Sequence, residues 1–243
     1  NYDRYTGISA GGLNAGFLSH FADIDEGIKE AEEMYSTIRN KNVYEILPVT
    51  RVSLLNTHPL NKTLTSIVTN MNSPPVIETL IGAVNLNTGN LDIYKYNDNN
   101  LVEDKVLLLM STSAIPIAFP PIKYNNYMYA DGGTLSNELL DIVHSSDYLN
   151  ITYITPYSLM DEDDTSIDSI TDMIERTFQL VKKNYNNPFT RLYQDCDKPY
   201  GEITYYYVDS EMLNNFTMLN FDKGKDLIAI GYNHVKSKKY TLC

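Results

Sequence analysis

The sequence predicts an α/β fold, namely a three-layer α/β/α sandwich with a largely parallel central sheet. Segments that resemble strands alternate with segments that resemble helices, as in chains whose helices connect parallel strands. The chain has 243 residues, of which 43% are hydrophobic, so it can bury a sizeable core. No repeat, low-complexity tract or linker divides it, and residues 1–243 are expected to form a single domain.

Each element follows from its local pattern. Runs rich in β-branched and aromatic residues predict strands over 2–8, 78–85, 91–96, 127–130, 149–155 and 203–208. Apolar residues at helical spacing, or small residues after a strand, predict helices over 10–21, 24–38, 60–71, 106–113, 166–183 and 223–235. The turn-forming residues 86–90 predict a hairpin, and Pro116 predicts the end of the helix before it.

The charge excludes several classes of partner. The formal net charge is −12 and the pI is about 4.7. A nucleic-acid partner is not expected, because binding phosphates requires a basic surface. Electrostatic attraction to an anionic membrane is not expected either, so any contact with a membrane surface would be transient and mainly apolar. Neither a transmembrane segment nor a signal-peptide core is visible, which leaves soluble and peripheral locations open.

The sequence predicts no metal site and no cofactor. Cys196 and Cys243 are too few for a disulfide framework, and no cysteine or histidine cluster has zinc-ligand spacing. The acidic run over 161–164 lacks the glycine and the terminal glutamate of an EF-hand loop. It is therefore interpreted as a solvated loop before a helix rather than as a calcium site.

The strongest local motif is Gly7-Ile8-Ser9-Ala10-Gly11-Gly12, which fits the G-x-S-x-G pattern. A strand before it and a helix after it form the context of a nucleophile elbow, where glycines relieve crowding in a sharp turn. The N–H groups at the helix start, such as that of Ala10, suit a developing oxyanion. One alternative is a glycine-rich turn with an incidental serine; a phosphate-binding loop is disfavoured because the pattern fits neither phosphate-loop motif.

A second motif, Tyr129-Ala130-Asp131-Gly132-Gly133, lies 122 residues after Ser9 (131 − 9). A serine nucleophile needs a base, and an aspartate at the end of a strand is well placed to act as one. By itself, the motif is more typical of an ordinary Asp-Gly turn.

Together the two motifs resemble the patatin-like phospholipases, which pair a G-x-S-x-G elbow with a later D-G-G or D-G-A motif as a Ser–Asp dyad. Residues 113–122, with their Ile-Pro and Phe-Pro-Pro steps, are similar to that family's signature segment. Further similarities extend the resemblance over nearly the whole chain, at 11–15, 53–60, 80–89 and 221–232.

The resemblance implies a lipid acyl hydrolase of the phospholipase A, lysophospholipase or general esterase type, which acts on a lipid or ester substrate without metal. Ser9 would attack the ester carbonyl, and Asp131 would take the serine proton directly and then activate water. Gly7, Gly11, Gly132 and Gly133 would support the elbow and the aspartate loop.

The sequence departs from the family pattern before the elbow. The family's first strand and its glycine-rich oxyanion loop are expected well before the nucleophile, whereas eight residues precede Ser9. Three explanations are open: the sequence is N-terminally incomplete, a separate N-terminal chain or segment supplies the loop, or the loop is lost. The last explanation gives the alternative function, a non-catalytic structural or interaction subunit.

Two further alternatives concern other side chains. A conventional triad could combine Ser9 and Asp131 with His144 or His234, although ordinary surface or partly buried histidines are favoured. An acyl groove could be formed by apolar residues that fit core packing equally well, namely Leu107, Leu108, Leu109, Met110, Ile115, Ile117 and Phe119.

Overall fold

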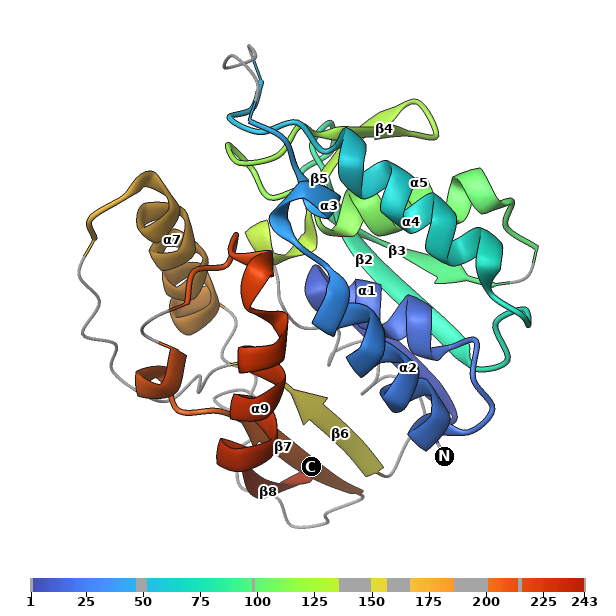
Figure 1. Cartoon of the computed structure of the whole chain (residues 1–243), viewed down its shortest axis with the longest axis vertical. Helices are drawn as coiled ribbons and strands as arrows, with labels where there is room; N and C mark the ends of the chain where they lie inside the picture. Colours follow the sequence, from blue (N-terminus) through green and yellow to red (C-terminus); the bar gives the residue numbers. More distant parts are fainter. Residues whose placement is uncertain are drawn as a thin grey trace. The chain divides into compact units, whose positions relative to one another are not determined.

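The computed structural model describes residues 2–46, 52–97, 99–135, 150–156, 167–185, 201–213 and 216–242. They belong to two compact units, Asn1–Asn137 and Glu138–Cys243, each with its own β-sheet. Helices and strands occur in both units, which confirms the expected α/β class (Figure 1). The expected three layers and the single domain over 1–243 stay predictions.

The first unit contains most of the elements that the sequence predicts. In chain order they are β1 Arg4–Ile8, α1 Ala10–Leu18, α2 Ile24–Thr37, α3 Asn40–Val43, α4 His58–Asn70, β2 Glu78–Asn85, β3 Asn90–Tyr96, α5 Val102–Thr112, β4 Ile122–Tyr124, β5 Tyr127–Asp131 and the 3₁₀ turn η1 Gly132–Thr134. The three that were not expected, α3, β4 and η1, are only three or four residues long. Elements this short carry too little periodicity for detection in the sequence.

β2 is the central strand of this unit's sheet. β3 pairs along one edge of β2, while β1 and β5 share the other edge, and β4 pairs with β5. Among these pairs only β1 with β2 is parallel, so the described sheet is more antiparallel than expected. For two of the three antiparallel pairs, β2–β3 and β4–β5, the reason is that a short turn joins the strands, and a short turn can join only antiparallel strands.

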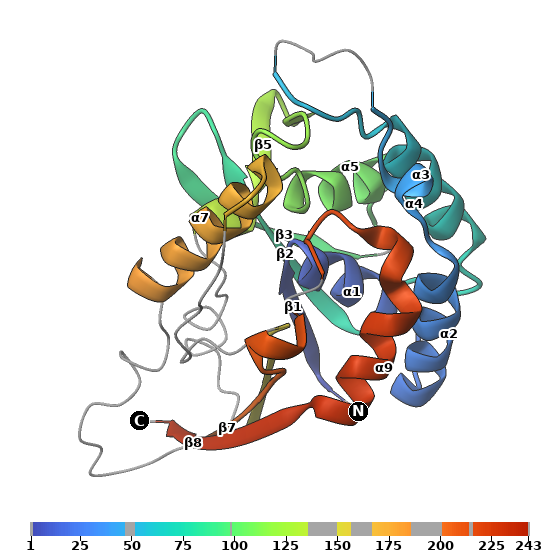
Figure 2. The ribbon, with the colours of Figure 1, turned by 60° about the vertical axis from the view of Figure 1, so that its left-hand side comes forward.

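The core of the first unit lies between β2 and two helices. α1 and α5 both contact β2 and each other, α2 packs on α1, and α4 packs on α5 (Figures 1 and 2). Residues 79–85 of β2 are all buried, because the strand is flanked on both edges and covered by helices. Burying a Val, Leu or Ile side chain stabilises the fold by about 1.5 to 3 kcal/mol. α5 supplies four buried apolar side chains, those of Val106, Leu108, Leu109 and Met110.

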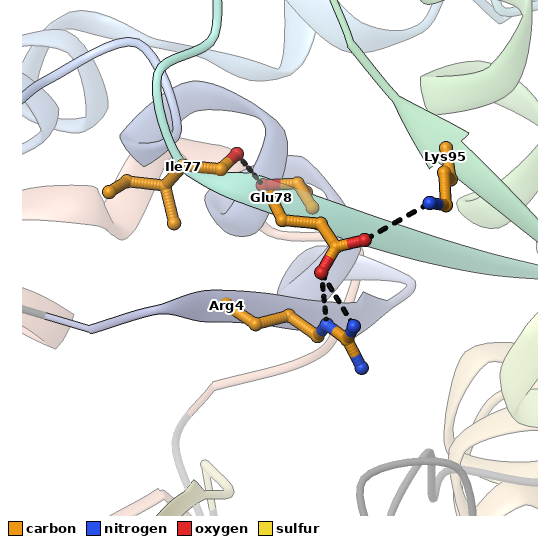
Figure 3. Close-up of polar contacts among 5 residues, drawn as sticks. Arg4, Ile77, Glu78 and Lys95 are labelled. Carbon is orange, nitrogen blue, oxygen red and sulfur yellow. Dashed lines mark hydrogen bonds and ion pairs between the residues drawn. The ribbon is translucent and has the colours of Figure 1, made fainter. Parts of the chain in front are cut away.

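An ion-pair cluster joins the beginning of β1 to the next two strands (Figure 3). Arg4 lies opposite Glu78 in the β1–β2 register, and its Nε donates to Glu78 Oε2 at 2.8 Å. The other carboxylate oxygen, Oε1, lies 3.2 Å from Lys95 Nζ on β3. These two cations lower the pKa of Glu78, chiefly through the hydrogen bonds from Arg4 and Lys95.

The second unit contains β6 Asn150–Ile154, α7 Ile170–Tyr185, β7 Gly201–Tyr207, η2 Ser210–Leu213, η3 Phe221–Lys223, α9 Gly224–His234 and β8 Lys236–Leu242. β6 pairs with β7 in parallel, and β8 pairs with β7 in the antiparallel direction. β8 was not expected, because its first four residues, Lys-Ser-Lys-Lys, are not typical of a strand. Lysines are common on edge strands, where they discourage pairing with other chains. Within the described part of the chain, no helix combines the length and apolarity needed to cross a membrane.

Candidate active site

Two strands of the first unit end at the same point of the sheet. β1 runs parallel to β2 and ends at Ile8, opposite Gly82. β5 runs antiparallel to β2 along the same edge and ends at Asp131, opposite Ala83. Because Gly82 and Ala83 are neighbours, the C-terminal ends of β1 and β5 meet head to head. The topology therefore brings Ser9, the residue after β1, next to Asp131.

Ser9 occupies a sharp turn between β1 and α1. Its backbone has φ 56° and ψ −130°, a combination that non-glycine residues rarely adopt. The carbonyl oxygen of Ser9 accepts hydrogen bonds from the N–H groups of Gly12 and Leu13, which start the helix. Strain of this kind persists only where the surroundings hold it, and it is concentrated at functional sites. The arrangement of strand, turn and helix is the one that a G-x-S-x-G motif requires.

The glycines around Ser9 differ in how much space a side chain would have. A Cβ on Gly7 would lie 2.1 Å from the carbonyl oxygen of Gly11, so β1 and α1 can approach this closely only with glycine there. A Cβ on Gly12 would lie 2.9 Å from Thr112 Cγ2. A Cβ on Gly11, in contrast, would meet open space. Steric crowding thus accounts for Gly7 and Gly12 and gives no account of Gly11, whose part in the site stays a prediction.

Asp131 is held by the turn that follows it. Its side chain is 1% exposed, and Oδ1 accepts the N–H of Gly133 at 2.7 Å, which caps the turn η1. Its own N–H donates to the carbonyl of Ala114 at 2.9 Å. A Cβ on Gly132 would lie 2.7 Å from Ile8 Cγ2 and 2.9 Å from the carbonyl oxygen of Gly82. Glycine at position 132 therefore permits the end of β5 to approach the end of β1.

The Ser9 hydroxyl donates to Asp131 Oδ2 at 2.6 Å. Ser9 is half-buried, whereas Ala10 and Gly11 beside it are exposed, so the serine can be reached while the aspartate lies beneath it. The N–H groups of Ala10 and Gly11 begin α1 and have no acceptor among the described residues. An N–H at a helix start is a suitable donor to an anion. The arrangement offers a nucleophile, a base and an anion-binding position within a few residues.

The end of β5 is anchored by a polar network that no local pattern in the sequence predicts. Tyr129, two residues before Asp131, is fully buried and donates to Asp92 Oδ2 on β3 at 2.9 Å. Asn85 of β2 donates to the same oxygen, and the hydroxyls of Tyr94 and Tyr129 are also hydrogen-bonded. Burial is the largest cause that raises the pKa of Tyr129, so its hydroxyl keeps its proton. The network links β5 to β3, the two strands that pair with β2 on opposite edges.

A residue outside the quoted motifs, Thr112, contacts Ser9 directly. The backbone N–H of Ser9 donates to Thr112 Oγ1 at 2.9 Å, and the Thr112 hydroxyl donates to the carbonyl of Gly82 at 2.6 Å. Thr112 is fully buried at the end of α5. A threonine just ahead of the 113–122 segment carries no sequence signal of its own, because its contacts are made far along the chain.

The histidines, cysteines and acidic residues considered for other roles lie elsewhere in the chain. The ring of His20 is bonded through Nδ1 to Ser73 O and through Nε2 to Tyr96 Oη, in the interior of the first unit. His234 ends α9 in the second unit. His144, both cysteines and the acidic run over 161–164 lie outside the described residues. Among the described residues, no group of three or more His, Cys, Asp or Glu side chains could hold a metal ion.

The suggested acyl-groove residues separate into two groups. Six of the seven are wholly or partly buried, including Ile115 at 7% and Phe119 at 3% exposed, which fits core packing. Ile117 is 61% exposed and has φ 71°, a value that a β-branched residue rarely adopts. Ile117 lies three residues after Ala114, so their Cα atoms are at most about 11 Å apart. The carbonyl of Ala114 accepts the N–H of Asp131.

Comparison with known proteins identifies the family of this chain. The family model of the patatin-like phospholipases matches residues 1–144, a segment that includes both Ser9 and Asp131. The match also includes the resembling segments 53–60, 80–89 and 113–122, whereas 221–232 lies beyond it. A search of curated proteins found no match.

Proposed function

The chain belongs to the patatin-like phospholipase family, a family of hydrolases, and from this premise we propose that it cleaves lipid acyl esters with Ser9 as nucleophile and Asp131 as base. The observation that carries the proposal is the 2.6 Å hydrogen bond from the Ser9 hydroxyl to Asp131 Oδ2. A carboxylate that already accepts the hydroxyl proton is positioned to remove it when the oxygen attacks.

In the first half of the reaction, Ser9 Oγ attacks the ester carbonyl carbon while its proton passes to Asp131 Oδ2. The carbonyl oxygen becomes an oxyanion, and the Ala10 N–H at the start of α1 is one donor that supports it. The intermediate then expels the alcohol, which takes the proton from Asp131. An acyl group remains on Ser9.

In the second half, Asp131 accepts a proton from water while the water oxygen attacks the acyl-enzyme carbonyl. Collapse of this intermediate releases the carboxylic acid, and the Ser9 oxygen regains a proton from Asp131. No metal and no cofactor takes part in the proposed sequence. The substrate is a lipid or a simpler carboxylic ester, approached at the exposed surface of Ala10 and Gly11.

Several features support these roles. The strained backbone of Ser9 forms the sharp turn after β1 that a nucleophile at the end of a strand requires. Asp131 Oδ1 is occupied by the Gly133 N–H, which leaves Oδ2 directed at the serine. A structural Asp-Gly turn needs the first of these contacts and has no need of the second.

The test is labelling of the native protein with a fluorophosphonate serine probe, followed by peptide mapping. We expect modification at Ser9 of wild-type protein and none in Ser9→Ala. A folded wild-type protein that is not labelled would favour the alternative function, a non-catalytic structural or interaction subunit. Hydrolysis of a lipid ester by Ser9→Ala at the wild-type rate would exclude Ser9 as the nucleophile.

A further inference from the structure

We propose that Thr112 is a positioning residue for the nucleophile, holding the backbone of Ser9 in the strained conformation that directs its hydroxyl to Asp131. The inference rests on the proposed function, because it concerns how the same serine is made ready to react. It goes beyond that function in assigning a role to a residue outside the Ser–Asp pair and the glycines around it.

The hydrogen bonds of Thr112 have a defined direction. A threonine hydroxyl has one proton to donate, and Thr112 donates it to the carbonyl of Gly82 at 2.6 Å. Its oxygen must therefore act as an acceptor toward Ser9, whose N–H lies 2.9 Å away. The chain of bonds runs from Ser9 N–H through Thr112 to Gly82. Because donors and acceptors in such a chain polarise one another, each bond strengthens the next.

The neighbouring hydroxyls show that this arrangement is not the ordinary behaviour of a helical threonine. Serine and threonine in a helix commonly donate to the carbonyl four residues earlier. Ser111 donates to Leu107 and Ser113 donates to Leu109 in this way, at 2.7 and 2.8 Å. Of these three consecutive side chains, Thr112 alone uses its hydroxyl to join β2 and the Ser9 turn.

The position of Thr112 explains how one side chain can act on the turn. Gly82 lies where the pairing of β2 with β1 ends, and Ile8, the residue before Ser9, is its partner. Thr112 thus ties the Ser9 peptide to the strand beside it. The absence of a side chain on Gly12 leaves room for Thr112, since a Cβ there would lie 2.9 Å from its methyl carbon.

The other half of the site is attached to the same end of α5. Ala114, two residues after Thr112, accepts the N–H of Asp131 at 2.9 Å. The backbone N–H of the nucleophile and that of the base are therefore both held by residues 112–114. With both groups attached to one short segment, the separation of Ser9 Oγ from Asp131 Oδ2 is set by local geometry. A displacement of about 1 Å in such a pair can lower the rate about 100-fold.

The test compares Thr112→Val, which keeps the shape and removes the hydroxyl, with Thr112→Ser, which keeps the hydroxyl. Ser111→Ala is the matched control, because it removes a buried neighbouring hydroxyl that bonds only within α5. Each full-length protein is assayed with a p-nitrophenyl ester. We expect Thr112→Val to lower kcat by about 10- to 100-fold with little change in KM, as misplacement of a reacting group predicts. Thr112→Ser and Ser111→Ala should stay near the wild-type kcat.

A second measurement does not depend on activity. Hydrogen exchange of the Ser9 amide, followed by NMR, should be slow in wild type and faster in Thr112→Val, with the melting temperature as the check on folding. If Thr112→Val does not fold, hydrogen exchange of the wild-type protein still tests whether the Ser9 amide is hydrogen-bonded. Its Ser9 amide should exchange more slowly than those of Ala10 and Gly11, which have no acceptor among the described residues.

The outcomes separate the two proposals. Suppose that the wild-type protein neither hydrolyses esters nor reacts with the phosphonate, yet its Ser9 amide exchanges slowly because of Thr112. This result overturns the proposed function and leaves the hydrogen bond between Ser9 and Thr112 as a structural contact. An active protein in which Thr112→Val retains the wild-type kcat overturns the positioning role. So does a Ser9 amide that exchanges as fast as that of Ala10.

Discussion

The hydroxyl of Ser9 and the carboxylate of Asp131 are in hydrogen-bond contact at 2.6 Å, although 122 positions separate them in the chain. Each stands at the end of a strand, and the two strands approach each other along one edge of β2. A contact of this length between a hydroxyl and a carboxylate is typical of a charge-assisted hydrogen bond. The aspartate is almost completely buried beneath the serine.

The first prediction concerns that carboxylate. Asp131→Asn keeps the size of the side chain and removes the group that accepts the serine proton. We expect kcat for a p-nitrophenyl ester to fall by about 10²- to 10⁴-fold, which is the usual contribution of general-base catalysis. Circular dichroism should show an intact fold. Asp104→Asn, which neutralises an aspartate in the first turn of α5, is the control and should keep wild-type activity. Comparable losses in both variants would contradict the assignment.

The sequence was sufficient to predict most of the first unit. The hairpin of β2 and β3, the strand before Ser9 and the helix after it all occur close to their expected bounds. They follow from local patterns, namely alternating or continuous apolar residues and turn-forming residues between them. The short elements α3 and β4 and the lysine-rich strand β8 were missed because each lacks such a pattern.

The contacts of the site were harder to predict, because they depend on strand pairing over long separations. The motifs pointed to Ser9 and Asp131, but no local rule places β5 antiparallel on the edge that β1 also uses. The roles of Thr112 and Tyr129 depend on contacts with residues far along the chain, Gly82 of β2 and Asp92 of β3, which only the folded sheet brings near. The same limit applies to the glycines. The motif treats Gly7 and Gly11 alike, whereas only the packed structure shows which one faces backbone atoms.

The second prediction follows from that contrast. Gly7→Ala places a methyl group 2.1 Å from the backbone oxygen of Gly11, so β1 and α1 must move apart. We expect it to lower the free energy of unfolding by about 2 kcal/mol or more, as overpacking does, and to abolish labelling of Ser9.

Gly11→Ala meets open space in a helical position and should leave stability unchanged or raise it by up to about 1 kcal/mol. Urea denaturation of both variants measures the difference. Equal destabilisation by the two substitutions would show that the close approach at Gly7 is not what constrains the turn.

The third prediction distinguishes a direct Ser–Asp pair from a triad that includes histidine. In a direct pair, Asp131 takes the proton itself, and no imidazole is needed for turnover. We therefore expect His144→Ala and His234→Ala, made singly, to keep kcat within about threefold of wild type, since loss of a general base would cost about 10² or more. The steady-state rate on a p-nitrophenyl ester is the measurement. Loss of activity in either variant, with its fold retained, would establish a triad instead.

The fourth prediction concerns acid stability and the cluster at the beginning of β1. Arg4 and Lys95 lower the pKa of Glu78 in the folded state, so the folded protein binds a proton at this site less readily than the unfolded chain does. The resulting stabilisation is fully present above the unfolded pKa, about 4.3. It is lost as the pH falls through the lower, folded pKa.

The test is Glu78→Gln, which removes the charge and keeps the shape. Since the Glu78 side chain is 36% exposed, solvent screening limits the effect, and we expect a loss of about 0.5 kcal/mol near pH 7. Urea denaturation at a series of pH values should show this difference shrinking as the pH falls below the unfolded pKa of about 4.3, and vanishing once Glu78 is protonated in the folded protein as well. Lys62→Met, which removes an unrelated charge from α4, should produce no such pH dependence. A constant difference from pH 7 to pH 3 would mean that packing, and not the ion pairs with Arg4 and Lys95, accounts for the contribution of Glu78.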